Sequence, residues 1–276
     1  ETTKLLIAAN ERPPLTLRIN RLKIEPGAFL RQLEQQGIAY TGSSRIAWFV
    51  RVKALARIGQ MELFRTGMFT VQDESAALPT LLLDPRPGER VIDLCAAPGG
   101  KTTNIAETMN NEGEVIAVDR HEAKLALIRT SCERLGLRNV TLREADSTVM
   151  EAAQADRVLL DAPCSGLGVL AKKPDIKWKR DITDILKLER IQAALLDNAA
   201  RLVKPGGVLV YSTCTLEPEE NAGAVDAFLA RHGEFSLESA APFVSRDLVN
   251  ERGFVETFPH RHGMDGTFAA RLVRHA

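Results

Sequence analysis

The segment VIDLCAAPGGKT, which runs from Val91 to Thr102, decides the fold. Its apolar first half is typical of a buried strand, and the small residues that follow lead into a helical pattern. Because small residues let the backbone approach a ligand at a helix N-terminus, the segment predicts a binding loop between a strand and a helix.

From Val91 onward, strand-like and helix-like segments alternate, a pattern typical of a parallel sheet with helices on both faces. Two amphipathic segments, Asp181–Val203 and Glu217–His232, are expected to be helices. The sequence predicts five strands of this sheet, at Val91–Ala96, Glu114–Asp119, Val140–Asp146, Arg157–Ala162 and Val208–Thr213. Two more segments, Phe235–Ser239 and Thr267–Val273, come too late for another crossover helix, and we expect them to close the sheet as an antiparallel pair.

The N-terminal quarter has a different character. Strand-like segments at Leu15–Asn20 and Ile46–Val52 flank a helix-like segment at Pro26–Gln36, which predicts a small α+β module. Residues 1–67 hold 11 Lys and Arg against 5 Asp and Glu, whereas residues 68–276 hold 25 against 31. We therefore expect a basic module, 1–67, for binding a polyanion, and a larger catalytic domain, 68–276. A chance charge excess on a solvated surface is the alternative.

Composition sets wide limits on the class of protein. The chain has 276 residues, 45% of them apolar, enough for a substantial core. No segment approaches the roughly 20 apolar residues of a membrane span, so we expect a cytoplasmic protein. The four cysteines form no Cys-x-x-Cys pair, so no metal site is predicted, and helical spacing assigns Cys132 to the core. The chain begins at Glu1 in a helix-like segment, as expected of a fragment of a longer protein.

Acidic residues end two successive predicted strands. Asp119 is suited to accept hydrogen bonds from the two hydroxyls of a ribose, and Asp146 could meet an adenine amino group. A phosphate-loop interpretation of Gly100-Lys101-Thr102 is weak, because that motif requires glycine where Cys95 stands, and the dinucleotide fingerprint is absent. The pattern therefore favours an adenosine-type ligand, although each aspartate taken alone could be a local cap.

Two cysteines follow the next two strands, at the same expected edge of the sheet. Cys164 comes shortly after Asp161, and Cys214 follows the last parallel strand. A strand-end cysteine is usually a small buried hydrophobe, but two that converge beside a ligand loop suggest chemistry. A thiolate can add to carbon 6 of a cytosine and make carbon 5 nucleophilic, and a second group can then assist proton loss and thiol release.

The chain resembles the Sun/Fmu family of RNA (cytosine-5)-methyltransferases, in particular its bacterial branch that acts on small-subunit (16S) ribosomal RNA. The resemblance spans nearly the whole chain. It is carried by Leu17–Asn20, Val71–Ser75, Asp93–Thr102, Asp161–Ser165, Pro174–Trp178 and Tyr211–Thr215.

The resemblance implies a Rossmann-like class I methyltransferase fold, with a mostly parallel seven-stranded sheet preceded by a small RNA-binding module. It implies S-adenosylmethionine as cofactor and RNA as substrate. It also implies that Cys214 is the nucleophile, that Cys164 assists product release, and that Asp161 belongs to the reaction site. The implied cofactor residues are Cys95, Ala96, Ala97, Pro98, Gly99, Gly100, Lys101, Asp119, Asp146 and Asp161.

A cationic segment, Ala171–Arg180, surrounds Trp178. It could hold phosphates and support an extruded base, or Trp178 could instead pack as a lid on the core. Other open alternatives are the same reaction on 23S rRNA or tRNA, and a non-catalytic RNA-binding assembly factor with this fold. A methyltransferase for exocyclic amines or protein is disfavoured, because Asp161-Ala162-Pro163-Cys164 stands where an Asn/Asp-Pro-Pro-Tyr motif is usual.

Overall fold

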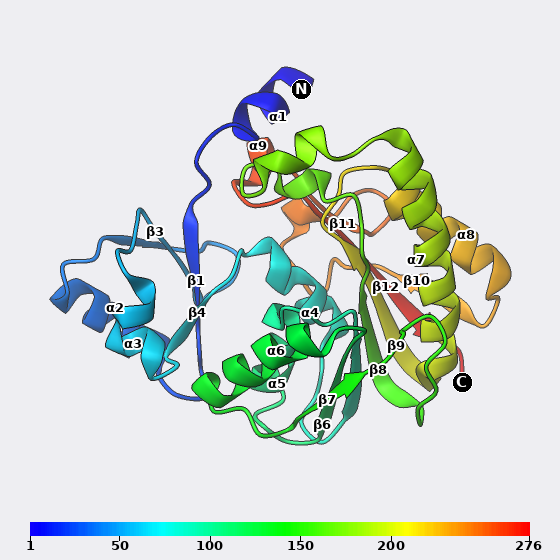
Figure 1. Ribbon diagram of the computed structural model, residues 1–276, viewed down its shortest axis with the longest axis horizontal. Helices are drawn as coiled ribbons and strands as arrows, with labels where there is room; N and C mark the ends of the chain where they lie inside the picture. The colour runs from blue at the N-terminus through cyan, green and yellow to red at the C-terminus, as the bar shows by residue number, and fades with distance from the viewer.

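The computed structural model describes residues 1–276 and contains two sheets (Figure 1). The larger sheet has the strand order β10-β12-β9-β8-β5-β6-β7, and a short strand, β11, pairs with β12. Its strands are β5 (Arg90–Leu94), β6 (Glu114–Asp119), β7 (Val140–Glu144), β8 (Ala155–Asp161), β9 (Val203–Thr213), β10 (Phe235–Glu238), β11 (Val255–Thr257) and β12 (Thr267–Arg274).

The pairing confirms the predicted α/β architecture. Strands β7, β6, β5, β8 and β9 are parallel, and β12 runs antiparallel to both β9 and β10. The predicted antiparallel closing pair is therefore present. Because parallel strands point their carboxyl ends to one edge, the segments that follow β5, β6, β7, β8 and β9 are brought together there.

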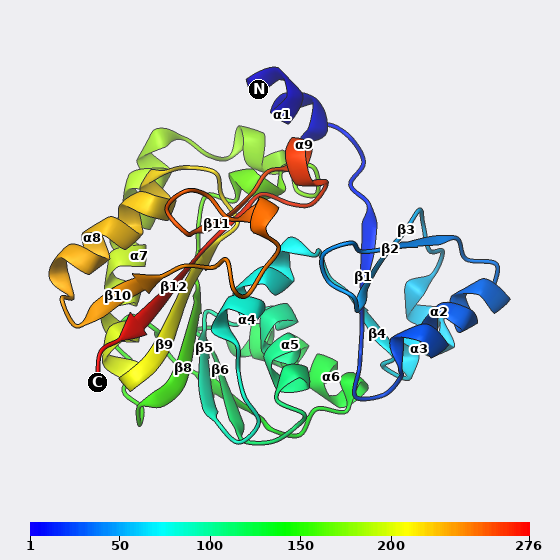
Figure 2. The same ribbon diagram turned by 180° about the vertical axis from the view of Figure 1, so that it is seen from behind.

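Helices cover both faces of the larger sheet (Figures 1 and 2). Successive residues of a strand point to opposite faces, so Val115 and Ala117 pack in one core and Ile116 and Val118 in the other. The first core lies beneath α4 (Leu78–Leu83), α5 (Gly100–Thr108) and α6 (Glu122–Leu135), and it includes Cys132, as predicted. The second lies beneath α7 (Ile182–Leu202) and α8 (Ala224–Arg231). No helix of the chain is long and apolar enough to cross a bilayer.

Most predicted boundaries differ from the observed ones by a few residues, and three of the differences have clear local reasons. Strand β5 ends at Leu94 because Cys95 takes a left-handed backbone conformation with φ +60°. Strand β9 begins five residues early, at Val203, where Pro205 and two glycines had hidden the strand pattern. The segment predicted as one helix, Glu217–His232, is a π-helical turn at Glu219–Gly223 followed by α8.

The smaller sheet has the order β2-β3-β1-β4, all antiparallel, and forms the N-terminal module with α2 (Pro26–Gln35) and α3 (Glu62–Arg65). Its strands are β1 (Leu15–Ile19), β2 (Tyr40–Gly42), β3 (Phe49–Val52) and β4 (Phe69–Val71). Phe29 and Leu33 of α2 pack on the sheet in a separate core. Since β4 pairs with β1, this sheet extends past residue 67 to Val71.

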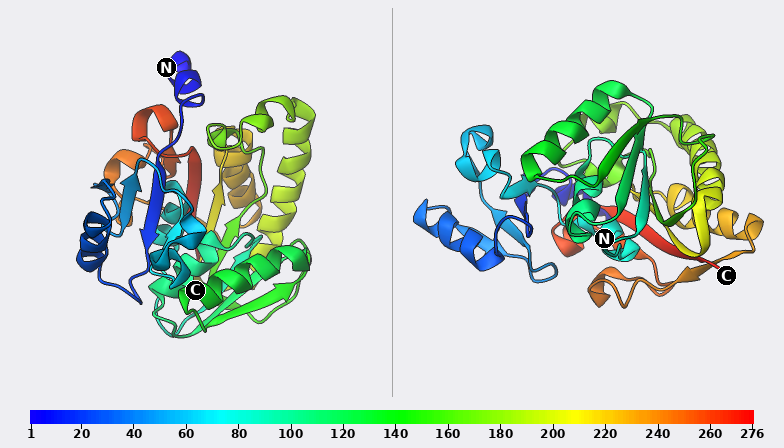
Figure 3. Two further views of the ribbon diagram at one scale, coloured as in Figure 1. Left: turned by 60° about the vertical axis from the view of Figure 1, so that its left-hand side comes forward. Right: turned by 90° about the horizontal axis from the view of Figure 1, so that it is seen from below.

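The module projects from one side of the larger domain, while the first helix, α1 (Thr2–Ala8), lies apart from it beside α9 (Pro259–His262) (Figures 1 and 3). Arg18 of β1 joins the two domains and is fully buried. Its guanidinium donates to the carbonyl of Gly100 at 2.8 Å, to Thr103 Oγ1 at 3.0 Å and to Glu107 Oε1 at 2.9 Å, all in α5. The module is thus fastened to the helix that follows the predicted ligand loop.

Candidate active site

A cavity of about 560 Å³ opens at the carboxyl ends of the parallel strands. Of the residues predicted from sequence, Cys95, Ala97, Pro98, Asp119, Asp161, Cys164 and Cys214 line it. Ala96, Gly99, Gly100, Lys101 and Asp146 do not. The structure therefore collects residues that are up to 119 positions apart in the chain around one space, next to the loop that precedes α5.

The two strand-end cysteines are in contact. The Sγ atoms of Cys164 and Cys214 lie 3.3 Å apart, and the backbone N–H of Cys214 donates to Cys164 Sγ, also at 3.3 Å. The thiol hydrogen bond from Cys164 lowers the pKa of Cys214, and the Lys101 ammonium lowers it further, against burial. The same hydrogen bond and burial raise the pKa of Cys164. The pair thus favours a thiolate at Cys214 and a protonated thiol at Cys164.

Asp161 is held between two donors. Lys101 Nζ donates to its Oδ2 at 2.6 Å, and Ser212 Oγ donates to its Oδ1 at 2.8 Å. Burial lowers the pKa of Lys101, but the Asp161 carboxylate, together with Cys214 and Asp93, raises it above the ordinary value, so the ammonium form is favoured. Although Lys101 does not line the cavity, it fixes a carboxylate that does.

The loop after β5 is shaped by its backbone. Cys95 and Gly99 both have positive φ, and a Cβ added at Gly99 would lie 3.0 Å from Ile128 Cγ1. The side chain of Ala96 packs into the core, so it supports the loop from below. Burial raises the pKa of Cys95 to about 12, which makes this cysteine a poor nucleophile.

The two strand-end aspartates differ in their surroundings. Asp119 is buried and lines the cavity; its Oδ1 accepts from the backbone N–H of His121 at 3.0 Å, and its Oδ2 makes no hydrogen bond within the chain. Asp146 instead turns toward its own loop. Its Oδ1 accepts from the N–H of Thr148 at 2.9 Å and from Thr148 Oγ1 at 2.7 Å, which holds its pKa below the ordinary value. The neighbours of Asp146, Ala145 and Ser147, line the cavity.

Sequence reasoning missed several cavity residues that lie within a few positions of a strand end. These are Arg120, His121 and Lys124 after β6, and Ala145 and Ser147 after β7. The rule that selected Asp119 could have found them had it been extended a few positions. Ile191 and Leu195 of α7, which also line the cavity, have no such signal because their contribution depends on helix packing.

Asp93 lies behind the loop, fully buried, with only Thr102 Oγ1 donating to it, at 2.6 Å. Burial raises the pKa of Asp93 to about 7. An unfolded aspartate ionises near ~3.9, so between about pH 4 and pH 7 the folded state holds a proton that the unfolded state has lost. Its contribution to stability is therefore present below that window and falls as pH rises through it.

We expect Asp93→Asn to remove this slope. The free energy of unfolding of the variant relative to the wild type should rise by ~1.4 kcal/mol per pH unit between about pH 5 and pH 7, then level off. Chemical denaturation at several pH values measures it. A difference independent of pH would show that Asp93 ionises normally in the folded protein.

The cationic segment Ala171–Arg180 is held by ion pairs near its start and is exposed to solvent around Trp178. Lys172 donates to Asp73 and, at 2.8 Å, to Asp265, which joins this segment to the residues after β4 and to the loop before β12. Trp178, in contrast, is 89% exposed, so the alternative that it packs as a lid on the core is wrong. Lys173 and Arg180, from the same segment, line the cavity.

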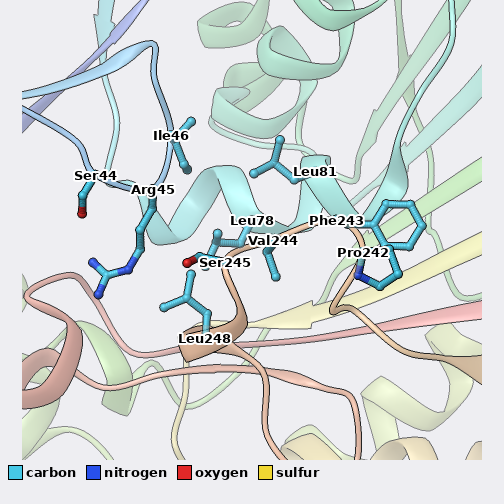
Figure 4. A pocket seen from close by; sticks show the side chains of 10 residues that line it. All are labelled: Ser44, Arg45, Ile46, Leu78, Leu81, Pro242, Phe243, Val244, Ser245 and Leu248. Atoms are coloured by element: carbon cyan, nitrogen blue, oxygen red, sulfur yellow. The ribbon is translucent and has the colours of Figure 1, made fainter.

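A second cavity, of about 360 Å³, lies between residues 44–46, α4 and residues 242–248 (Figure 4). Leu78, Val244 and Leu248 contribute apolar side chains to it, and Arg45 at its rim pairs with Asp247. It contains no cysteine and none of the strand-end residues. The chemistry predicted from the sequence therefore belongs to the first cavity.

Comparison with known proteins identifies the family of the chain. The family described as 16S rRNA methyltransferase RsmB/F matches residues 80–273, and an RsmF/B-like, ferredoxin-like domain matches residues 1–57. The chain is 39% identical to a probable ribosomal RNA small subunit methyltransferase B of Synechocystis, with 99% of this chain and 63% of that protein covered. Its Bacillus subtilis counterpart is 40% identical, with 94% and 60% covered.

Solved structures show the same fold. A crystal structure of PH0851 superposes with a TM-score of 0.92 at 34% identity, covering 99% of this chain and 62% of that one. NSun6 from Pyrococcus horikoshii, solved with SFG, gives a TM-score of 0.88 at 24% identity, with 99% and 94% covered. The chain spans about three fifths of the length of the curated relatives it matches. As the sequence motifs indicated, the chain belongs to the RsmB/F family of 16S rRNA methyltransferases.

Proposed function

We propose that this chain carries the catalytic part of an S-adenosylmethionine-dependent enzyme that methylates carbon 5 of a cytosine in 16S rRNA. The observation that carries the proposal is the contact between Cys164 and Cys214 at the edge of the cofactor-sized cavity. Methylation of a ring nitrogen or a ribose hydroxyl would need no such thiol pair. The names of the relatives support ribosomal RNA of the small subunit as the substrate.

The residues present fit the proposed cofactor. Asp119 offers a free carboxylate oxygen, Oδ2, at the end of β6, where it can accept hydrogen bonds from ribose hydroxyls. Ala97 and Pro98, from the loop before α5, add small side chains to the same cavity and leave room for a ligand. Asp146 does not line the cavity, although its Oδ2 makes no hydrogen bond within the chain. When bound, S-adenosylmethionine supplies an electrophilic methyl group.

The chain's own residues then prepare the base. The Cys214 thiolate adds to carbon 6, which leaves carbon 5 electron-rich and able to take the methyl group. A base next takes the proton of carbon 5, the electrons of that C–H bond return to the ring, and the bond between Sγ and carbon 6 breaks with its electrons on sulfur, which restores the aromatic ring and the Cys214 thiolate. Cys164, in contact with Cys214, is placed to assist this last stage. Asp161, fixed by Lys101 and Ser212, is placed to hold the polar edge of the cytosine.

The N-terminal module and the segment around Trp178 are proposed to contact RNA. Exposed cations of the module that have no acidic partner, Arg31, Lys53, Arg57 and Arg65, are available to phosphates. The exposed Trp178 ring can stack on an unpaired base near the cavity. We propose that the chain consists of a basic RNA-binding module, whose sheet β4 completes, and a catalytic domain. We also propose a cytoplasmic location, where ribosomal RNA would be available as substrate.

Replacing Arg31, Lys53, Arg57 and Arg65 with Gln should flatten the salt dependence of RNA binding. If three or four of these side chains neutralise phosphates, the slope of log affinity against log salt should fall by about 2 to 4. Filter binding at several salt concentrations measures it. Substitution is preferred to deletion because Arg18 and α1 pack against the larger domain. An unchanged slope would show that these four side chains do not contact RNA phosphates and would contradict the RNA-binding role of the module.

The proposed reaction is tested by incubating the protein with labelled S-adenosylmethionine and a 16S rRNA transcript, then digesting the RNA and separating the nucleosides. We expect the label in 5-methylcytidine. A 23S rRNA transcript and tRNA serve as substrate controls. Label in another nucleoside would contradict carbon 5 chemistry, and equal labelling of all three RNAs would contradict the assigned substrate. Absence of transfer with an intact fold would favour the non-catalytic assembly factor.

A further inference from the structure

The π-helical turn Glu219–Gly223 follows closely on Cys214 and buries two polar side chains. Glu220 has no exposed surface and Asn221 is 6% exposed. No Lys, Arg or His lies within ion-pair distance of Glu220, and its Oε2 has no hydrogen-bond partner. Burying a carboxylate without a cation is costly, so stability alone does not account for this residue. π-Helical turns inside helices occur frequently at functional sites.

Glu220 binds the residues on both sides of Cys164. Its Oε1 accepts from the backbone N–H of Ser165 at 2.9 Å and from Gln192 Nε2, also at 2.9 Å. The same Gln192 Nε2 donates to the carbonyl of Pro163 at 3.0 Å. One carboxylate oxygen therefore fixes the residue after Cys164 directly and the residue before it through Gln192.

Asn221 does the same for Cys214. Its Oδ1 accepts from Thr213 Oγ1, and its Nδ2 donates to the carbonyl of Thr215 at 3.1 Å. These are the residues immediately before and after Cys214. A bond of 2.6 Å between Ser165 Oγ and Thr215 Oγ1 then links the two cysteine loops to each other. Two adjacent side chains of one turn thus hold the residues on either side of both cysteines, directly or through Gln192.

We propose that Glu220 and Asn221 are positioning residues that set the contact between the two cysteines, Glu220 for Cys164 and Asn221 for Cys214. The inference rests on the proposed function, in which Cys214 attacks and Cys164 assists release. It predicts different kinetic defects for the two variants, whereas a general loss of stability would affect adduct formation and adduct resolution alike. Loss of Asn221 should slow formation of the RNA adduct, whereas loss of Glu220 should slow its resolution.

The test compares Glu220→Ala, Glu220→Gln and Asn221→Ala under single turnover with the 16S rRNA transcript. A denaturing gel follows the RNA–protein adduct. We expect Glu220→Ala to accumulate adduct that the wild type resolves, with resolution slowed about tenfold or more, the scale of one lost hydrogen bond to a charged group. Glu220→Gln keeps a carbonyl acceptor for Ser165 and Gln192, so it should behave like the wild type. Asn221→Ala should form adduct slowly and accumulate none.

Two controls keep the result interpretable. Val225→Ala removes a fully buried apolar side chain from α8 just beyond the turn, so it lowers stability without touching either cysteine loop. Cys164→Ala on the same gel tests the assigned role of Cys164 by itself. If it fails to trap adduct, that role fails, and the positioning is then judged by an RNA-free measurement.

That measurement is the rate at which diamide oxidises the two thiols to a Cys164–Cys214 disulfide, read by peptide mass spectrometry. Two thiol hydrogens pass to the diamide as the sulfur–sulfur bond forms. We expect Glu220→Ala and Asn221→Ala to form it about tenfold more slowly than the wild type and Val225→Ala. The proposal is overturned if a folded Glu220→Ala protein forms the disulfide at the wild-type rate.

Discussion

Cys214→Ala should abolish methyl transfer to RNA. Without the thiolate no bond forms at carbon 6, and carbon 5 stays unreactive toward the methyl donor. We expect the rate to fall by about a thousandfold or more, within the range seen when a nucleophile is removed. Incorporation of labelled methyl groups into the 16S rRNA transcript measures it.

Cofactor affinity should be unchanged in the same variant, because Asp119 and the loop before α5 remain intact. Isothermal titration with S-adenosylmethionine checks this. Cys132→Ala is the matched control: this cysteine lies on the buried face of α6, so the variant should lose stability but keep the methylation reaction. Substantial transfer by a folded Cys214→Ala protein would contradict the assignment of the nucleophile.

Cys164→Ala should have the opposite kind of effect. The first steps remain possible because Cys214 is present, but the methylated adduct should resolve slowly and accumulate as RNA joined to protein. The contact of 3.3 Å between the sulfurs and the raised pKa of Cys164 support this separation of roles. Cys214 should also be less acidic in the variant, since it loses the hydrogen bond that lowers its pKa.

A denaturing gel with labelled RNA detects the adduct as a slowly migrating band. We expect most of the enzyme to be trapped within one turnover, whereas the wild type should show only a small steady-state fraction. Product release at the wild-type rate would exclude Cys164 from the last stage. A band in Cys214→Ala would instead mean that the two roles are exchanged.

The sequence was sufficient for the parts of the fold that depend on local pattern. Strand β6 has the predicted bounds, because an uninterrupted apolar run ends at an acidic residue. The carboxyl-end rule alone predicts that Asp119, Asp161, Cys164 and Cys214 lie near one another, and all four line one cavity. It could not rank the two cysteines, which are distinguished by a hydrogen bond between the sulfurs and by the nearby Lys101.

The remaining features depend on contacts between distant segments. Nothing in the segment around Arg18 reveals that its side chain reaches α5. The first residue of that helix, Gly100, lies 82 positions later in the chain. The π-helical turn reads as the start of an ordinary helix, since Pro218 and acidic residues are typical of a helix N-terminus. The role of Asn221 becomes visible only when the two cysteine loops are seen together. Its side chain bonds the hydroxyl of Thr213 and the carbonyl of Thr215, on either side of Cys214.

The most direct test of the central claim is to identify the amino acid joined to RNA. Cys164→Ala is incubated with S-adenosylmethionine and the 16S rRNA transcript, the adduct is digested with protease and nuclease, and the joined peptide is sequenced by mass spectrometry. The account predicts a methylated cytidine on Cys214 and no adduct in the Cys164→Ala/Cys214→Ala double variant. A nucleotide on any other residue, or persistence of the adduct in the double variant, would contradict it.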